Sequence, residues 1–428
     1  MDEQLNLATE NTVSMEENVR FLRELSAEFF IGDNVSDTNC DIAIIGGGPV
    51  GASLALALRD SSLHVCVLEA RPATAASQDA RALALSYGSR LLLERLGIWD
   101  SLQNVSSISV IHISQRLSFG RAMLRAAELN VPALGYVLPY SELQNALQNA
   151  LSRAAAEKNY GKFQYLTGAS VSQLQGSADC STIGYQLHGT DHTVRARLAV
   201  VADGGKLLAQ QFTPEVRDYG QSALITHITC SQPQSEVAYE RFTAQGPVAL
   251  LPFQDGYELV WTAQHQRAQE MLAWDDMKFL SELHRHFGDR VGAFLTVGKR
   301  TCFPLVLKRA PQLSPMPHTL LLGNAAQTLH PVAGQGFNLG LRDAWELAQA
   351  ILDSTPESLG TDAMLSFHRK HRRIDREAGI RFTDSLVRVF SNDLPLVSTS
   401  RAAALSALDC LPFAKRFVAK RMMFGTNG

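Results

Sequence analysis

The 428-residue sequence contains only six cysteines, and no two of them form a Cys-x-x-Cys pair. Structural zinc sites and disulfide frameworks both need regularly spaced cysteines, so the sequence predicts neither a metal centre nor a disulfide-stabilised fold. A reducing, cytoplasmic compartment fits this pattern best. The cysteines are Cys40, Cys66, Cys180, Cys230, Cys302 and Cys410.

Long hydrophobic runs and a strong net charge are also lacking. No run approaches the roughly 18 consecutive apolar residues of a membrane-spanning helix, and the N-terminus is acidic where a secretory signal would be basic. The net charge of −3 argues against a nucleic-acid partner. The chain is long enough for two or three domains with a large core.

Charge is unevenly distributed along the chain. Residues 1–39 hold nine acidic and two basic side chains, which leaves this segment at −7 and the remainder at +4. Ser14 and Glu17 have the spacing of a helix-capping box, and apolar residues follow at helical intervals. We predict an acidic, helical N-terminal extension, which either packs on the rest of the protein or docks a partner.

Residues 46–51 form a Gly-x-Gly-x-x-Gly fingerprint between a buried strand and an aliphatic helix. This context is typical of dinucleotide binding. Gly46 allows a tight turn, Gly48 lets the backbone approach a pyrophosphate, and Gly51 allows the helix to pack closely on the strand. Glu69 ends the next strand, 18 residues later, where a carboxylate accepts hydrogen bonds from a ribose.

Residues 320–344 form a second glycine-rich stretch, with a short aliphatic strand, a loop and an amphipathic helix. The loop contains Gly323, Pro331, Gly334 and Gly336. Its glycines allow backbone N–H groups to approach a planar ligand, and the helix that follows directs its positive end toward that ligand.

These stretches resemble the FAD signatures of the single-component aromatic-ring flavin hydroxylases, and residues 323–331 resemble the ubiquinone-biosynthesis branch of that family. Asn324 stands where the wider family has Asp. The resemblance implies FAD as the bound cofactor and NAD(P)H as a transient reductant. It also implies that O₂ forms a flavin C4a-hydroperoxide, which hydroxylates a phenol ring.

The resemblance also implies a set of site residues. Arg81, Gln144 and the Asp203–Gly204 turn match family positions near the FAD. A surface arginine, a structural glutamine in a capping box with Ser141, and a plain turn remain open alternatives. No catalytic residue is assigned, and the expected flavin-facing loop is Pro331, Gly334, Gln335 and Gly336. The expected cofactor-binding residues are Gly46, Gly48, Gly51, Glu69, Arg81, Gln144, Asp203, Gly204, Gly323, Asn324, Gly334, Gly336, Phe337 and Asn338.

Between residues 222 and 263 the hydrophobic period changes to two, which predicts an antiparallel sheet. Laid over a flavin, the apolar face of this sheet would roof a cavity. Residues of these types in such a pattern are more often plain core. The candidates are Tyr239, Phe242, Leu250, Pro252, Phe253 and Trp261.

We therefore predict an α/β fold with a Rossmann-like FAD-binding domain, an interleaved antiparallel-sheet substrate domain and a helical C-terminal region. The FAD-binding domain takes residues 40–215 and 300–355, the sheet domain takes 216–299, and the C-terminal helices take 356–428. Five basic residues at 369–376 are interpreted as a solvated helix face.

The resemblance implies a 2-polyprenyl-6-methoxyphenol type of substrate. The alternatives are a hydroxylase of small soluble aromatic compounds and an FAD-binding scaffold of a biosynthetic complex. Phe413, Phe417 and Phe424 share one helical face beside basic residues, which predicts reversible contact with a membrane surface or a partner protein. The resemblance implies that these would be the inner membrane and other ubiquinone-biosynthesis proteins.

Overall fold

The computed structural model divides the chain into two compact units, Met1–Thr38 and Asn39–Gly428. The predicted N-terminal helix lies outside the described residues. No helix among the described residues is long and apolar enough to cross a membrane. The structure describes residues 38–74, 79, 81–157, 162–210, 212–328, 335–390 and 395–425.

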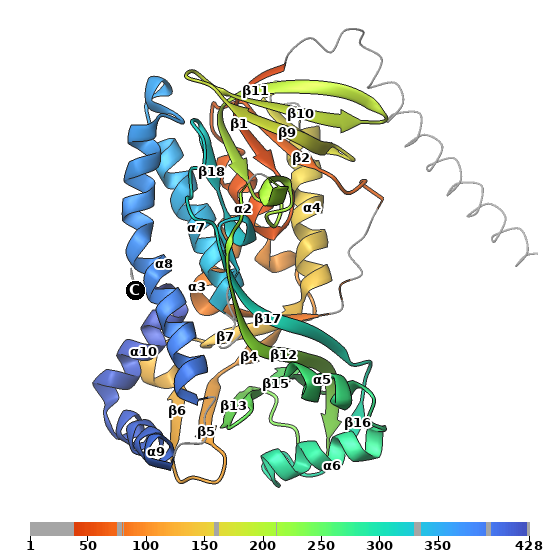
Figure 1. The fold of residues 1–428 in the computed structure, drawn as a ribbon, viewed down its shortest axis with the longest axis vertical. Coiled ribbons are helices and arrows are strands. Elements are labelled where there is room, and N and C mark those ends of the chain that lie inside the picture. The colour runs from red at the N-terminus through yellow and green to blue at the C-terminus, as the bar shows by residue number, and fades with distance from the viewer. Residues whose placement is uncertain are drawn as a thin grey trace, which may run out of the picture. The chain divides into compact units, whose positions relative to one another are not determined.

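A seven-stranded sheet is built around the parallel strands β1 (Thr38–Ile45) and β2 (Val65–Glu69), as Figure 1 shows. Its order is β8-β2-β1-β11-β10-β9, with β18 beside β11. Strands β9, β10 and β11 are antiparallel, whereas β8 and β18 pair in parallel. The bounds are β8 Phe163–Thr167, β9 Ser170–Gly176, β10 Ser181–Leu187, β11 Thr190–Val201 and β18 Thr319–Leu321.

Both faces of β1 are buried, which explains why its sequence is apolar without alternation. Ile42 and Ile44 share a core cluster with residues of several helices, including three whose bounds follow, whereas Ala43 and Ile45 share one with residues of β9 to β11. This arrangement confirms the Rossmann-like prediction. The helices are α2 Pro49–Leu58, α4 Tyr140–Ala156 and α7 Gln335–Leu352.

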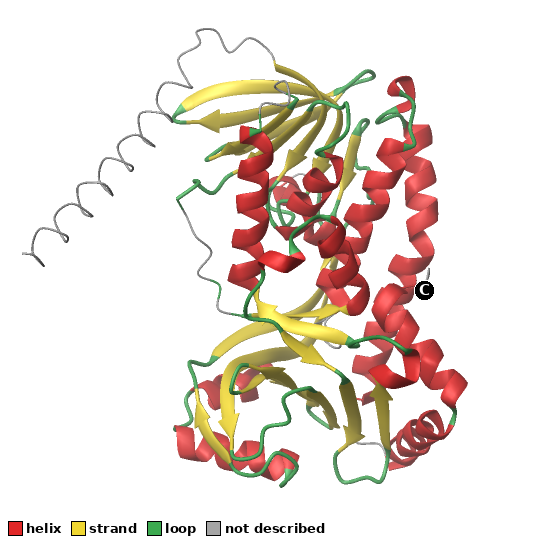
Figure 2. Cartoon of the chain, turned by 180° about the vertical axis from the view of Figure 1, so that it is seen from behind, coloured by secondary structure: helices red, strands yellow, loops and turns green. Residues whose placement is uncertain are grey.

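A nine-stranded sheet lies below the first one in Figures 1 and 2. Antiparallel pairing of β12, β13, β14 and β15 confirms the period-two prediction. Two further strands, β5 and β6, come from the segment assigned to the FAD-binding domain, so the chain crosses between the sheets repeatedly. The bounds are β5 Val110–Gln115, β6 Arg121–Arg125, β12 Glu215–Cys230, β13 Val237–Thr243, β14 Gly246–Phe253, β15 Gly256–Gln264, β16 Phe294–Val297, β17 Thr301–Arg309 and β19 Gln327–Thr328.

Helices α5 (His265–Leu272) and α6 (Asp276–Phe287) contribute to the core cluster of this second sheet. Leu250 and Trp261 belong to this cluster together with Phe279 of α6. Since side chains alternate along a strand, the neighbours of Leu250 and Trp261 point to the opposite face.

A small three-stranded sheet and four more helices complete the described fold. Ser86 caps helix α3 by accepting a hydrogen bond from the Ser89 N–H, and Gly97 follows the helix with a φ of +72°. The bounds are β3 Ala82–Ser86, β4 Ser106–Ile108, β7 Gly135–Pro139, α3 Tyr87–Arg95, α8 Asp362–Phe390, α9 Pro395–Cys410 and α10 Pro412–Phe424.

A buried charge cluster joins α7 to α8. Arg372 is 1% exposed, and its guanidinium donates to Asp343 at 2.8 Å and to Asp375 at 2.6 Å. Arg342 also pairs with Asp375, at 3.3 Å. The prediction of a solvated face is wrong for Arg372, because Asp343, which is distant in sequence, and Asp375 on the same helix neutralise it inside the protein.

Removing one partner of this cluster should destabilise the protein strongly. Asp343→Ala leaves the buried Arg372 guanidinium incompletely paired, and we expect a loss of about 3 to 5 kcal/mol in the free energy of unfolding. Asp362→Ala is the matched control, because its side chain is 88% exposed and pairs with Arg369 at the surface. The control should lose about 1 kcal/mol or less. Urea unfolding measures both, and equal losses would contradict the assignment.

Candidate active site

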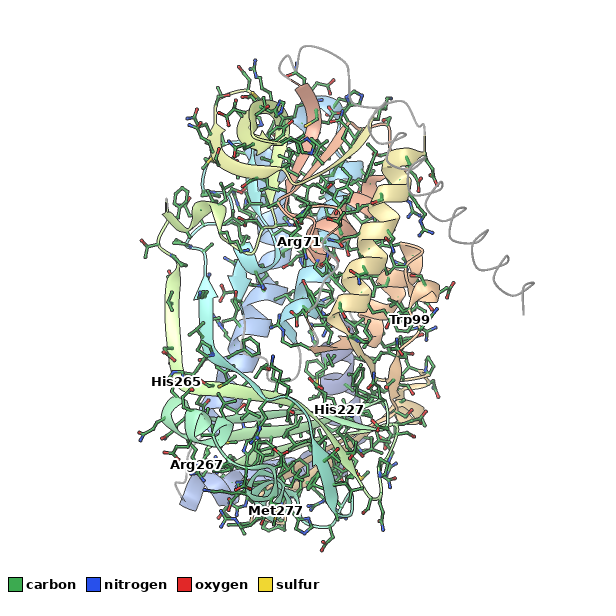
Figure 3. The ribbon with its side chains drawn as sticks, turned by 90° about the vertical axis from the view of Figure 1, so that its right-hand side faces the viewer. Arg71, Trp99, His227, His265, Arg267 and Met277 are labelled. Carbon is green, nitrogen blue, oxygen red and sulfur yellow. The ribbon has the colours of Figure 1, made fainter. Side chains whose placement is uncertain are left out.

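A cavity of about 1210 Å³ is lined by residues of both large sheets and of the C-terminal helices. Gly48 and Arg71 line it at the fingerprint turn, which we call the nucleotide-binding end after its predicted role, and Leu251 and Met423 line it from the second sheet and from α10. Figure 3 shows Arg71 beside the upper elements and His227 on the sheet below. Among the described residues, no group of three His, Cys, Asp or Glu side chains is placed to hold a metal ion.

The geometry of the fingerprint turn fits the three predicted glycine roles. Gly46 has a φ of +106°, and a Cβ there would lie 2.7 Å from the Ala202 carbonyl oxygen. A Cβ at Gly51 would lie 2.1 Å from the Gly46 carbonyl oxygen. At Gly48, in contrast, a Cβ would meet no described atom within 4 Å. The turn is therefore closed toward the protein and open toward the cavity.

Helix α2 offers an anion site at this turn. Its N-cap is Gly48, and no described side chain caps its first N–H groups. Those groups carry the partial positive charge of the helix end, which favours a bound phosphate. The residues present therefore fit the pyrophosphate of FAD.

Glu69 lies at the carboxyl end of β2, and its carboxylate binds the backbone of the fingerprint turn. One carboxylate oxygen accepts a hydrogen bond from the Gly47 N–H at 2.6 Å, and the other accepts from Arg71 Nε at 2.8 Å. Burial by itself would raise the pKa of Glu69, but the hydrogen bonds and charge of Arg71 together with the Gly47 N–H hold that pKa below its usual value. An ionised carboxylate thus lines the nucleotide-binding end, where it was predicted to meet a ribose.

Gln144 is fully buried and donates to the Gly47 carbonyl oxygen at 3.0 Å. The capping-box interpretation is wrong, because α4 already begins at Tyr140 and its N-cap is Pro139. The side chain instead holds the fingerprint turn in place from the side of α4. Its predicted contact with FAD stays a prediction.

Asp203 and Arg81 line the cavity but also make local contacts. The Asp203 carboxylate accepts hydrogen bonds from the N–H groups of Gly205 at 2.8 Å and Leu207 at 2.6 Å, which shapes the turn at Gly204. Arg81 Nε donates to Asp79 at 2.8 Å. Both side chains are therefore held at the cavity wall before any ligand arrives.

The second glycine-rich stretch supplies another part of the wall. The cavity lining includes Gly323, Asn324, Gly336, Phe337 and Asn338. The Asn338 side chain accepts from the Ser86 N–H at 2.8 Å and donates to the Ala84 carbonyl at 3.1 Å, which ties α7 to β3. Pro331 and Gly334 lie outside the described residues, and Gln335 begins α7.

The sheet end of the cavity only partly matches the predicted lining. Tyr239 and Phe242 line it, whereas Leu250, Pro252, Phe253 and Trp261 do not. The opposite face of the same strands lines the cavity, because strand alternation sends Leu250 and Trp261 toward α6. The lining residues that sequence reasoning missed include Arg71, Glu240, Ala249, Leu251, Val260, Thr262, Leu405 and Met422.

Helix α10 closes part of the cavity. Val418, Met422 and Met423 line it, and the Met423 carbonyl accepts a hydrogen bond from Ser86 Oγ at 2.9 Å. Phe424 packs edge-to-face on Tyr87, with ring centroids 6.1 Å apart. The C-terminal segment is therefore part of the fold, and Phe424 is separated in its packing from Phe413 and Phe417, which are exposed.

A side chain at Gly48 should weaken binding of the cofactor without unfolding the protein. Gly48→Val projects into the open end of the turn, where we expect roughly 10- to 100-fold weaker FAD binding through overpacking against the ligand. Gly51→Val is the contrast, because it meets backbone and should destabilise the fold itself. Flavin absorbance per protein and the urea midpoint distinguish them. Unchanged FAD affinity in Gly48→Val would overturn the assignment.

The sequence pattern of the FAD binding domain family matches residues 39–379 of the chain. The chain is 32% identical over 403 residues to the ubiquinone hydroxylase UbiL of Rhodospirillum rubrum, covering 91% of this chain and 90% of that protein. It is also 32% identical over 391 residues to the 3-demethoxyubiquinol 3-hydroxylase of Escherichia coli, covering 88% and 96%.

Solved structures share the fold at low sequence identity. The p-nitrophenol 4-monooxygenase PnpA of Pseudomonas putida superposes with a TM-score of 0.72 at 16% identity, covering 90% of this chain and 97% of that one. The family match, the named relatives and the geometry of the fingerprint turn all indicate the same cofactor, FAD. The chain belongs to the FAD binding domain family and is a flavin-dependent monooxygenase.

Proposed function

We propose that this protein hydroxylates a polyprenylated phenol in ubiquinone biosynthesis, with NAD(P)H as reductant and O₂ as oxidant. The observation that carries the proposal is the cavity that extends from the nucleotide-binding turn to the C-terminal helices. The names of the relatives, which include a ubiquinone hydroxylase and a demethoxyubiquinol hydroxylase, support the same substrate class.

The far end of the cavity suits a prenyl chain. Its wall is apolar there, with Leu251 and Val260 from the sheet and Leu405, Leu408 and Met422 from the C-terminal helices. A prenyl chain offers no hydrogen bonds, so its affinity would come from burial of apolar surface, at about 25 cal/mol per Å². A small polar aromatic acid would leave most of this wall in contact with water.

In the proposed reaction the cofactor supplies the oxygen chemistry, and the protein supplies binding and orientation of the substrate. Bound FAD, once reduced, activates O₂ for transfer of one oxygen atom to an electron-rich ring. The chain's own residues bind the ring, orient it and exclude water from the cavity. The sequence contains one dinucleotide fingerprint, which supports a nicotinamide donor that binds only transiently.

An assay with purified holoprotein tests this function. We expect NAD(P)H-dependent, O₂-dependent hydroxylation of a farnesylated methoxyphenol, and little product from hydroxybenzoate at the same concentration. The opposite preference would favour a hydroxylase of small soluble aromatic compounds. NAD(P)H oxidation without any hydroxylated product, or no oxidation at all, would favour a scaffold role.

We further propose that the outer face of α10 binds a membrane surface, from which such a substrate would be drawn. Phe413 and Phe417 are 72% and 61% exposed. Arg416 and Lys420 are exposed between and beside them at helical spacing, so aromatic and basic side chains share one face. The other face of the same helix lines the cavity. A lipid surface with anionic headgroups fits this pairing of apolar and basic groups.

Point variants test this contact better than truncation, because deleting α10 would open the cavity. Phe413→Ser with Phe417→Ser should reduce co-sedimentation with anionic vesicles by roughly tenfold or more, since each buried aromatic side chain contributes about 1.5 to 3 kcal/mol. Phe367→Ser is the matched control, because Phe367 is 68% exposed on α8. High salt should weaken wild-type binding. Equal sedimentation of all three proteins would mean that substrate arrives through a partner protein.

A further inference from the structure

One carboxylate stands out in the cavity wall. Glu240 lies in the middle of β13, and its cross-strand neighbours are Ala249 on β14 and Ile113 on β5. Both neighbours line the cavity, as do Ala238 and Phe242 on the same face of β13. An acidic residue thus occupies the apolar wall that the sheet presents to the cavity.

Glu240 differs from the other lining carboxylates in having no partner among the described residues. Glu69 is held by Gly47 and Arg71, and Asp203 by Gly205 and Leu207. Burial raises the pKa of Glu240 to about 7, with no contribution from a charged neighbour. The other titratable residues that line the cavity are Arg71, Arg81, Tyr140, Lys206, Tyr239 and Arg401.

A structural role alone does not account for such a group. An unpaired carboxylate in an apolar wall destabilises the fold, whereas a buried carboxylate with a structural role has a hydrogen-bond donor. Glu258 on β15 provides the contrast. It is buried, and burial likewise raises its pKa to about 7, but the Ala82 backbone N–H acts in the opposite direction on that pKa. No described residue donates to Glu240, so we look for its donor in a ligand that enters the cavity.

We propose that Glu240 binds the phenolic hydroxyl of the substrate and accepts its proton. This inference rests on the proposed function and adds a catalytic residue to it. The O–H bond breaks, its proton moves to the carboxylate, and the electron pair stays on the phenolate oxygen. That oxygen donates electron density to the ring as the ring accepts an oxygen atom. The hydroxylated carbon then loses its hydrogen as a proton, which combines with the second oxygen atom of O₂ as that atom leaves as water. Aromaticity returns, and Glu240 returns its proton to the phenolate oxygen.

Glu240→Gln tests the role, because the amide keeps the shape of the side chain but is not a base. We expect kcat/KM for hydroxylation to fall by about 100-fold or more, with unchanged FAD content. In the wild type, kcat/KM should fall as the pH is lowered through about 7, because a protonated carboxyl group is not a base. The variant should lack this pH dependence.

The matched control is Glu236→Gln, at the entry to β13. Glu236 is exposed and accepts hydrogen bonds from Ser107 and Ser109 outside the cavity. The control should keep the wild-type rate and pH profile. A wild-type pH profile and rate in Glu240→Gln would overturn the inference while leaving the proposed function intact.

A binding measurement keeps the two proposals distinguishable. Oxidised holoprotein is titrated with a farnesylated methoxyphenol and with its O-methyl ether, and the change in flavin absorbance reports binding. The wild type should prefer the free phenol by about tenfold or more, and Glu240→Gln should lose that preference. This measurement needs no turnover, so equal affinity of the wild type for both compounds would overturn the role of Glu240 even if hydroxylation fails for another reason.

Discussion

The contact between two backbone turns holds the nucleotide-binding end together. The turn at Gly46 packs so closely on the turn at Ala202 that a single Cβ would lie 2.7 Å from the Ala202 carbonyl oxygen. The Ala202 N–H donates to the Ile45 carbonyl, and the Gly46 N–H donates to the Leu68 carbonyl, both at 2.8 Å. Three chain segments that are far apart in sequence therefore meet at the turn where we predict the pyrophosphate to bind.

The second sheet separates two tasks by its two faces. Strand alternation directs large apolar side chains such as Trp261 into the core with α6, and leaves smaller ones such as Ala249 to line the cavity. The face toward α6 stabilises the fold through burial of apolar side chains. The face toward the cavity leaves room for a ligand, and Glu240, which has no partner among the described residues, lies on it.

The C-terminal helices complete the enclosure. Helix α8 is fixed to α7 by the Arg372 cluster, and α10 is fixed to β3 through the hydrogen bond between Ser86 and Met423. Each link joins a helix of the C-terminal region to an element that lines the nucleotide-binding end. The apolar end of the cavity thus depends on contacts whose partners lie more than 25 residues apart in the chain, as the pairing of Arg372 with Asp343 illustrates.

The sequence by itself determined the elements whose signals are local. The glycine spacing at 46–51 dictated the tight turn, and the period-two pattern of 222–263 dictated an antiparallel sheet, because both depend on neighbouring residues alone. It also limited the cofactor class through its two glycine-rich stretches. Period-two alternation does not say which face meets the ligand, however. Only the tertiary structure decided that Ala249 lines the cavity while Leu250 is core, and that Arg372 is buried and Glu240 faces a ligand space. Each of these depends on segments brought together by folding, so no local pattern carries the information.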